Sequence, residues 1–118
     1  MSKVVVVVLT DTETHESRGR VVNALEFAKE LRKNDDEVAI IFDGAGTKWI
    51  PELEDEQNNT HPLYEAIKRD IVGACKFCAK AFGVINEIRE SNVSLLNDYD
   101  QHPSLRNYIV EGYQIVTF

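Results

Sequence analysis

The chain has 118 residues, a length typical of one domain, so residues 1–118 are predicted to form a single domain. Its apolar fraction of 43% and charged fraction of 28% are those of an ordinary globular protein. The formal net charge of −7 repels phosphate backbones and anionic lipid headgroups, and no cluster of Lys or Arg offsets it, so nucleic-acid and membrane partners are not expected.

The first apolar segment and the two cysteines bear on location. The run from Val4 to Leu9 is too short for a signal peptide and far too short to span a bilayer. Cys75 and Cys78 lie three residues apart, which is not the disulfide framework of a small secreted protein. We therefore expect a cytoplasmic protein whose thiols are kept reduced.

The N-terminal part of the chain predicts two strands that flank one helix. The unbroken β-branched run from Val4 to Leu9 is typical of a strand buried on both faces of a parallel sheet. Ser17 is a candidate cap for the next helix, in which apolar residues recur at helical spacing from Val21 to Leu31. Residues 38–42 predict a second buried strand, which ends in a tight turn at residues 43–46.

The rest of the chain continues the alternation of helices and strands. Residues 49–59 have no period and are predicted to form an irregular loop, after which His61-Pro62 opens a helix that runs to about Arg69. Three further strands are predicted at residues 71–74, 93–96 and 113–118, and three further helices at residues 75–82, 85–91 and from Pro103 to about Gly112. This alternation predicts an α/β fold with a mainly parallel five-stranded sheet covered on both faces.

Candidate binding residues follow from the carboxyl edge of that sheet. In open parallel sheets, ligands bind outside the carboxyl ends of the strands. Polar residues after the predicted strands are expected at this edge, together with His61 and His102, which precede the helices after the second and fourth strands. The candidate binding residues chosen from this edge are Asp11, Asp43, Gly44, His61 and Asn97.

The candidate catalytic residues are Cys75 and Cys78. Cys75 lies where a strand gives way to a helix, and the free N–H groups of a helix start favour a thiolate, with a pKa expected between about 3.5 and 7.5. A thiolate attacks disulfides and persulfides. Cys78, one turn later, is within reach of a disulfide with Cys75 and is a candidate resolving thiol. The alternative is that both are small buried hydrophobic residues.

No cofactor or metal is expected. The loop at residues 10–14 is superficially similar to a flavodoxin phosphate loop, but it has no glycine, and its acidic residues repel phosphate, which argues against flavin. A Cys-x-x-Cys pair supplies half of a structural zinc site. The other half needs two of the three histidines, His15, His61 and His102, none of which have paired spacing.

The chain resembles the DsrE-like family, with its DsrE, TusD and YchN types, over nearly its whole length. The similar segments are the Val-rich first strand, residues 37–44, residues 75–83 and residues 112–118. The most specific match is Cys75 after the third strand, followed eight residues later by Gly83 at the end of a short helix. The resemblance implies a flavodoxin-like three-layer fold, assembly into homotrimers or hexamers, and, as in the relay members, a persulfide-carrying cysteine that maps to Cys75. Cys78 has no counterpart in the relay subunits and matches a Cys-x-x-Cys variant of other members.

Three functions remain open at this point. The first is a sulfur carrier that holds a persulfide on Cys75 and exchanges it with donor and acceptor proteins. The second is a dithiol redox protein that uses Cys75 and Cys78. The third is a non-catalytic oligomeric binding module with inert cysteines.

Overall fold

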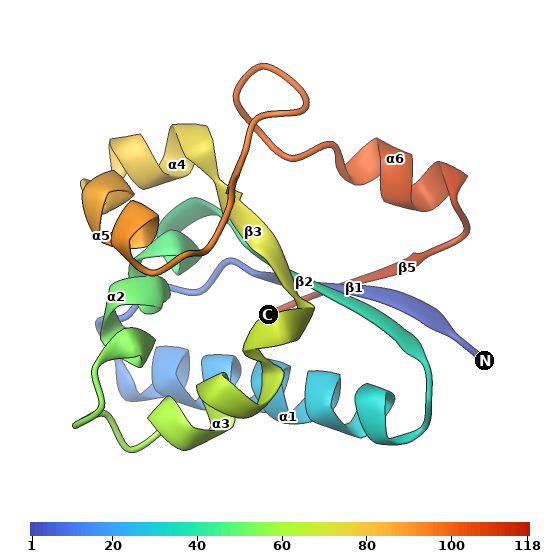
Figure 1. Cartoon of the computed structure of the whole chain (residues 1–118), viewed down its shortest axis with the longest axis horizontal. Coiled ribbons are helices and arrows are strands. Elements are labelled where there is room, and N and C mark those ends of the chain that lie inside the picture. The colour runs from blue at the N-terminus through green and yellow to red at the C-terminus, as the bar shows by residue number, and fades with distance from the viewer.

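A computed structural model describes all of residues 1–118. Its strands are β1 (Lys3–Val8), β2 (Glu37–Phe42), β3 (Ile71–Cys75), β4 (Leu95–Leu96) and β5 (Gln114–Thr117). All neighbouring strands pair in parallel, in the order β4-β3-β2-β1-β5 (Figure 1). The predicted α/β fold around a five-stranded parallel sheet is therefore confirmed. Successive strands from β1 to β4 add toward one edge, and β5 adds beside β1 on the other.

Helices cover the sheet. They are α1 (His15–Lys33), α2 (Trp49–Glu54), α3 (His61–Ile67), α4 (Lys76–Ala81), α5 (Ile85–Glu90) and α6 (Leu105–Val110), with short 3₁₀ helices η1 (Gly44–Lys48) and η2 (Lys68–Asp70). None of them combines the length and the apolar composition that a membrane crossing requires. The prediction of an irregular loop at residues 49–59 is wrong for residues 49–54, which are helical. There α2 forms because Trp49, Ile50 and Leu53 share one helical face and are all buried.

Two helix starts differ from the prediction. Helix α1 is capped by Thr14, whose Oγ1 accepts a hydrogen bond from the Ser17 N–H at 3.0 Å, so Ser17 lies buried in the first turn and is not the cap. Helix α6 is capped by Ser104, which accepts from the Asn107 N–H at 3.3 Å. Pro103 therefore precedes that helix rather than opening it. In both cases a hydroxyl three residues before a free backbone N–H fixes the start.

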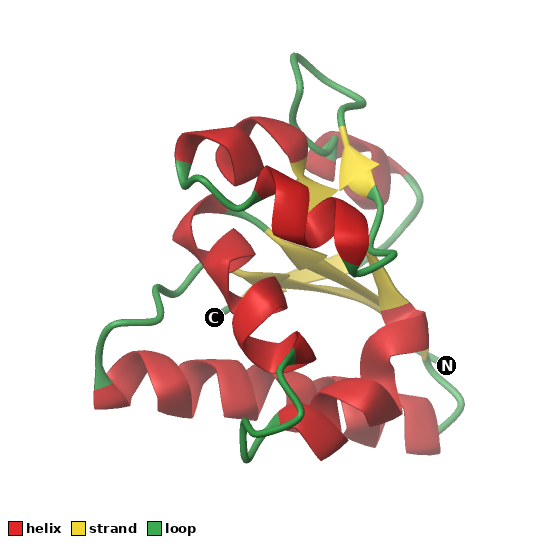
Figure 2. Ribbon diagram, turned by 60° about the vertical axis from the view of Figure 1, so that its left-hand side comes forward, coloured by secondary structure: helices red, strands yellow, loops and turns green.

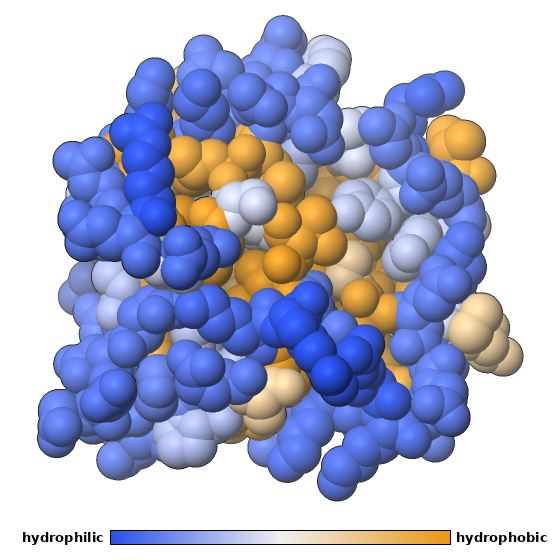
Figure 3. All heavy atoms as spheres, viewed as in Figure 1, coloured by the Kyte–Doolittle hydropathy of each residue, from blue (hydrophilic) through white to orange (hydrophobic).

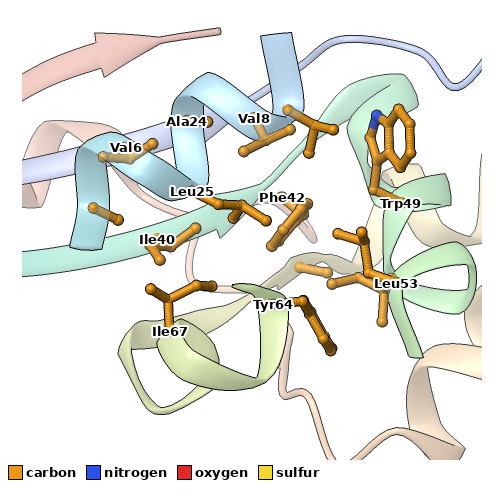
Figure 4. Packing of buried hydrophobic residues seen from close by; sticks show 14 of the residues in the cluster. Val6, Val8, Ala24, Leu25, Ile40, Phe42, Trp49, Leu53, Tyr64 and Ile67 are labelled. Carbon is orange, nitrogen blue, oxygen red and sulfur yellow. The ribbon is translucent and has the colours of Figure 1, made fainter. Parts of the chain in front are cut away.

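The hydrophobic core is divided unequally between the two faces of the sheet. Alternate side chains of the strands face α1, α2 and α3, where they join a cluster of 19 buried residues (Figure 4). The opposite face has a cluster of only four, Val5, Val7, Ala39 and Ile41, packed against partly buried residues that include Leu105 and Tyr108 of α6. Figure 2 shows the sheet between these two layers. Figure 3 shows hydrophobic atoms at the surface in the area between α4 and α6.

Residues 43–46 form the entry to η1 rather than an isolated tight turn. The Asp43 Oδ1 accepts a hydrogen bond from the Gly44 N–H at 2.8 Å and so caps η1. A Cβ atom on Gly46 would lie 2.1 Å from the carbonyl oxygen of Val8, so only glycine lets η1 pack this closely against the end of β1. This packing holds Asp43 at the carboxyl end of β2, beside the end of β3.

Candidate functional site

Four side chains with chemically useful groups meet at the carboxyl edge of the sheet. Asp43 follows β2, Cys75 ends β3, Cys78 lies in the first turn of α4, and His102 lies in the segment after β4. One ligand-type atom of each, namely a carboxylate oxygen, two sulfurs and an imidazole nitrogen, lies within 4.8 Å of all the others. We call these four residues the thiol cluster.

Cys75 is the buried member of the thiol cluster. It ends β3 and caps α4, with its Sγ accepting a hydrogen bond from the Cys78 N–H at 3.4 Å. Its Sγ also lies 3.2 Å from the Nδ1 of His102. Burial raises the pKa of Cys75 to about 12 and outweighs the opposing effect of the Cys78 N–H. The lowered pKa predicted from its place at a helix start is therefore wrong, because loss of solvent dominates over the first turn of a six-residue helix.

A strained hairpin places His102 against Cys75. Tyr99 and His102 exchange backbone hydrogen bonds of 2.8 and 2.7 Å, and the two residues between them, Asp100 and Gln101, have φ angles of 47° and 69°. This is the geometry of a tight turn that glycine or asparagine usually fills, and a left-handed Gln costs on the order of 1–3 kcal/mol. The Phe77 N–H donates to the Gln101 carbonyl at 2.9 Å, and its ring lies 4.9 Å from the imidazole of His102. Phe77 of α4 therefore holds the hairpin, and with it His102, next to the two thiols.

Cys78 and Asp43 form the more exposed side of the thiol cluster. The Cys78 thiol is half-buried and donates to the Asp43 Oδ1 at 3.4 Å. Burial raises the pKa of Cys78, against the opposing effect of hydrogen bonds from Cys75 and from the Gly44 N–H. Asp43 has no ion-pair partner, and its hydrogen-bond donors are the Gly44 N–H and the Cys78 thiol. The cluster thus combines a carboxylate and two thiols with no basic side chain paired to that carboxylate.

The predicted binding residues separate into two groups. Asp43 belongs to the thiol cluster, and Gly44 contributes its N–H to it. Asp11 instead forms an ion pair of 2.9 Å with Lys48. The His61 Nδ1 lies 2.7 Å from the carbonyl oxygen of Leu53, which ties α3 to α2.

Asn97 is exposed, and its side chain makes no hydrogen bond within the protein. Asp11, His61 and Asn97 therefore do not join the cysteines.

His102 is the member that sequence reasoning did not select. Nothing in the spacing of the three histidines distinguishes it from His15 or His61. The signal lies in the order of the strands: β4 pairs with β3 and places Leu96 beside Cys75, so the segment after β4 turns toward the thiol. The spacing of the histidines spoke against a site with two of them, whereas the fold brings one histidine and Asp43 to the two cysteines.

Known proteins are similar to this chain over nearly its whole length. A model of the DsrE/DsrF-like family matches residues 3–118. An uncharacterized protein of Methanocaldococcus jannaschii is 36% identical over 96 residues, which are 81% of this chain and 78% of that protein. A solved structure of a conserved protein of unknown function from Bacteroides thetaiotaomicron superposes with a TM-score of 0.67 over 97% of this chain and 94% of that one. Its sequence identity is 18%, so this likeness concerns the fold.

Proposed function

Since the chain belongs to the DsrE/DsrF-like family, we propose that it carries sulfur as a persulfide on Cys75. The observation that carries this proposal is the separation of 3.2 Å between the Cys75 Sγ and the His102 Nδ1. A buried thiol is a poor nucleophile until it loses its proton. An imidazole nitrogen within hydrogen-bond reach supplies the base that this step needs.

Loading of the sulfur is a transfer between thiols without net oxidation. His102 takes the proton of Cys75, and the resulting thiolate attacks the outer sulfur of a donor persulfide. A new S–S bond forms on Cys75 while the S–S bond of the donor breaks. The donor leaves as a thiolate and receives the proton from His102. The donor approaches from the side of Cys78, because Cys78, Asp43 and His102 are all partly exposed whereas Cys75 is buried.

Release of the sulfur has two routes that the thiol cluster can support. An external acceptor thiolate can attack the outer sulfur and regenerate the Cys75 thiol. Alternatively, the Cys78 thiolate can attack the inner sulfur, which expels hydrogen sulfide and leaves a Cys75–Cys78 disulfide. The second route makes Cys78 a resolving thiol and requires an external dithiol to restore both cysteines.

The proximity of the two thiols also favours a second candidate function, that of a dithiol redox protein. The Cys78 N–H donates to the Cys75 Sγ, and the two sulfurs lie within 4.8 Å. Reduction of a substrate disulfide to two thiols would oxidise Cys75 and Cys78 to one disulfide, with the two thiol protons passing to the products. Equal reactivity of the wild type and Cys78→Ser toward a disulfide substrate would argue against this function.

The sulfur-carrier proposal is tested by intact-mass measurement. The reduced protein is incubated with a cysteine desulfurase and cysteine, in the presence of a metal chelator. We expect the mass of one sulfur atom to be added to Cys78→Ser and, at early times, to the wild type before Cys78 resolves it, and none to Cys75→Ser. A wild-type protein that stays unmodified while the desulfurase turns over contradicts the proposal.

A further inference from the structure

The thiol cluster has the ligand types of a zinc site. It offers two thiols, one imidazole and one carboxylate, contributed by Cys75, Cys78, His102 and Asp43. Zn²⁺ binds all three kinds of ligand in proteins and prefers four of them. Mg²⁺ and Ca²⁺ are not suited to this set, because hard cations select oxygen and two of the four donors are sulfur.

The separations between the ligand atoms are close to those of a tetrahedral zinc site. With Zn–S of about 2.3 Å and Zn–N or Zn–O of about 2.0–2.2 Å, the ligand atoms of a tetrahedral site lie about 3.3–3.8 Å apart. The Sγ of Cys75 lies 3.2 Å from the Nδ1 of His102, and the Sγ of Cys78 lies 3.4 Å from the Oδ1 of Asp43. No pair of ligand atoms exceeds 4.8 Å. Closing the tetrahedron around an ion therefore needs a contraction of no more than about 1 Å.

Backbone groups hold these side chains in place from outside the cluster. The Cys78 N–H donates to the Cys75 Sγ at 3.4 Å, and the Gly44 N–H donates to the Asp43 Oδ1 at 2.8 Å. The tight turn at Asp100 and Gln101 brings the backbone of His102 to the cluster, and the ring of Phe77 lies 4.9 Å from its imidazole. Such outer contacts orient metal ligands and tune their affinity. No Lys or Arg pairs with the carboxylate of Asp43, so its negative charge is free to bind a cation.

We propose that Asp43, Cys75, Cys78 and His102 form a binding site for one zinc ion. Both thiols give up their protons to the solvent on binding, and His102 binds through Nδ1. Because all four ligands come from the protein, the coordination shell is closed, as in structural zinc sites. A further consequence rests on the proposed function: zinc on the Cys75 sulfur blocks the attack that loads sulfur, so the zinc-bound and persulfide-bearing states exclude each other.

The test uses Co²⁺ as a spectroscopic substitute for zinc. The full chain is reduced, stripped with a chelator, freed of the chelator and titrated with Co²⁺ and then with Zn²⁺. We expect thiolate-to-cobalt charge-transfer bands and the intense visible absorption of tetrahedral cobalt, saturating at one equivalent per chain. One equivalent of Zn²⁺ should abolish both. A weak octahedral spectrum, or no spectrum, overturns the proposal.

Single substitutions identify the ligands. Cys78→Ser, Asp43→Asn and His102→Gln change partly exposed side chains, and each should weaken zinc binding by more than about 100-fold. The matched controls are Asp11→Asn and His61→Gln, the carboxylate and the imidazole that do not join the cluster, and they should leave affinity unchanged. The assignment of these residues as zinc ligands is overturned if zinc binding is weakened equally in the controls, or if all three cluster variants keep full zinc affinity. Thermal melting of the metal-free variants separates ligand loss from unfolding.

The outcome is independent of the sulfur-carrier proposal. Metal binding is measured with no sulfur donor present, and sulfur loading is measured in chelator with no metal. If cobalt binds and sulfur does not load, the site is a metal site and the carrier proposal fails. If sulfur loads and cobalt does not bind, the metal proposal alone fails. If both succeed, zinc added before the donor should abolish loading.

Discussion

The Sγ of Cys75 and the Nδ1 of His102 lie 3.2 Å apart, although the two residues are 27 positions apart in the sequence. The contact joins the carboxyl end of β3 to the hairpin after β4, and it depends on the pairing of these two strands at Cys75 and Leu96. A buried thiol with a raised pKa thus has an imidazole within hydrogen-bond reach. The chemistry available to Cys75 therefore depends on His102.

Replacement of His102 by Gln should slow sulfur loading on Cys75 by about 100-fold, because the thiol loses the base that removes its proton. The measurement is the rate of mass gain with the desulfurase system in chelator. His61→Gln is the control, since His61 binds the carbonyl of Leu53 and not a thiol. A loading rate in His102→Gln equal to that of the wild type would mean that His102 takes no part.

Replacement of Cys78 by Ser should lengthen the lifetime of the Cys75 persulfide, because the attack that forms the internal disulfide is removed. The loaded protein is separated from its donor, and the persulfide is followed by mass while released sulfide is measured. The wild type should release sulfide and gain a Cys75–Cys78 disulfide, and the variant should do neither. Equal lifetimes in the two proteins would exclude Cys78 as a resolving thiol.

The fold was largely predictable from the sequence, because its central strands β1 and β2 are almost entirely apolar runs. Val4–Val8 is buried on both faces, and this is why no alternation is seen in it. Helix α2 was missed because it has six residues, too few to show a clear period, and Pro51 near its start looks like a helix breaker. Proline is tolerated in the first turn, because the N–H that it lacks would have no hydrogen-bond partner within the helix there.

The site was only half predictable. The position of Cys75 at the end of a strand follows from the pattern, but the contact with His102 requires the order of the strands. It also requires a tight turn built from Asp100 and Gln101, which lacks the usual glycine. The pKa of Cys75 depends on how completely the chain covers its sulfur. The burial of a strand end is decided by tertiary packing, so it cannot be predicted from the residues next to Cys75.

Replacement of Arg32 by Ala should lower the free energy of unfolding by about 2 kcal/mol, because it leaves a buried carboxylate without its partner. The Nη1 of Arg32 lies 2.9 Å from the Oδ1 of Asp70, whose side chain is 6% exposed and whose Oδ2 has no hydrogen-bond partner. Urea denaturation measures the change. Arg20→Ala removes the exposed pair with Glu16 and should cost less than about 0.5 kcal/mol. If the two variants lose the same stability, the burial of Asp70 has no energetic weight.

Glu54 should make stability depend on pH in the acid range. Burial raises its pKa, but hydrogen bonds from Lys68 at 2.7 Å and Tyr64 at 2.5 Å outweigh this, so its pKa lies below the ordinary value of 4.5. The folded state therefore binds this proton less readily than the unfolded chain. The stabilisation is complete above about pH 4.5 and is lost as the pH falls through the lowered pKa of the folded state.

The corresponding variant is Glu54→Gln, which should be less stable than the wild type by about 1 kcal/mol at neutral pH. The difference should shrink as the pH falls below about 4.5, because protonation gives the wild-type side chain the same neutral character. Chemical denaturation at a series of pH values measures it. A difference that stays constant across the acid range would show that the pKa of Glu54 is not lowered.

Self-assembly stays a prediction, and the thinly covered face of the sheet indicates where to test it. That face buries only four core residues, and α6 beside it exposes Ile109 by 62% and Val110 by 67%. If copies of this chain associate through α6, Ile109→Glu should reduce a trimer or hexamer to a monomer, because a carboxylate buried in the contact would be unpaired. Light scattering coupled to gel filtration measures the mass. Asn23→Glu, which adds the same charge on the exposed side of α1, should leave it unchanged. A wild-type protein that is monomeric at high concentration contradicts self-assembly, and an oligomer that survives Ile109→Glu places its interface elsewhere.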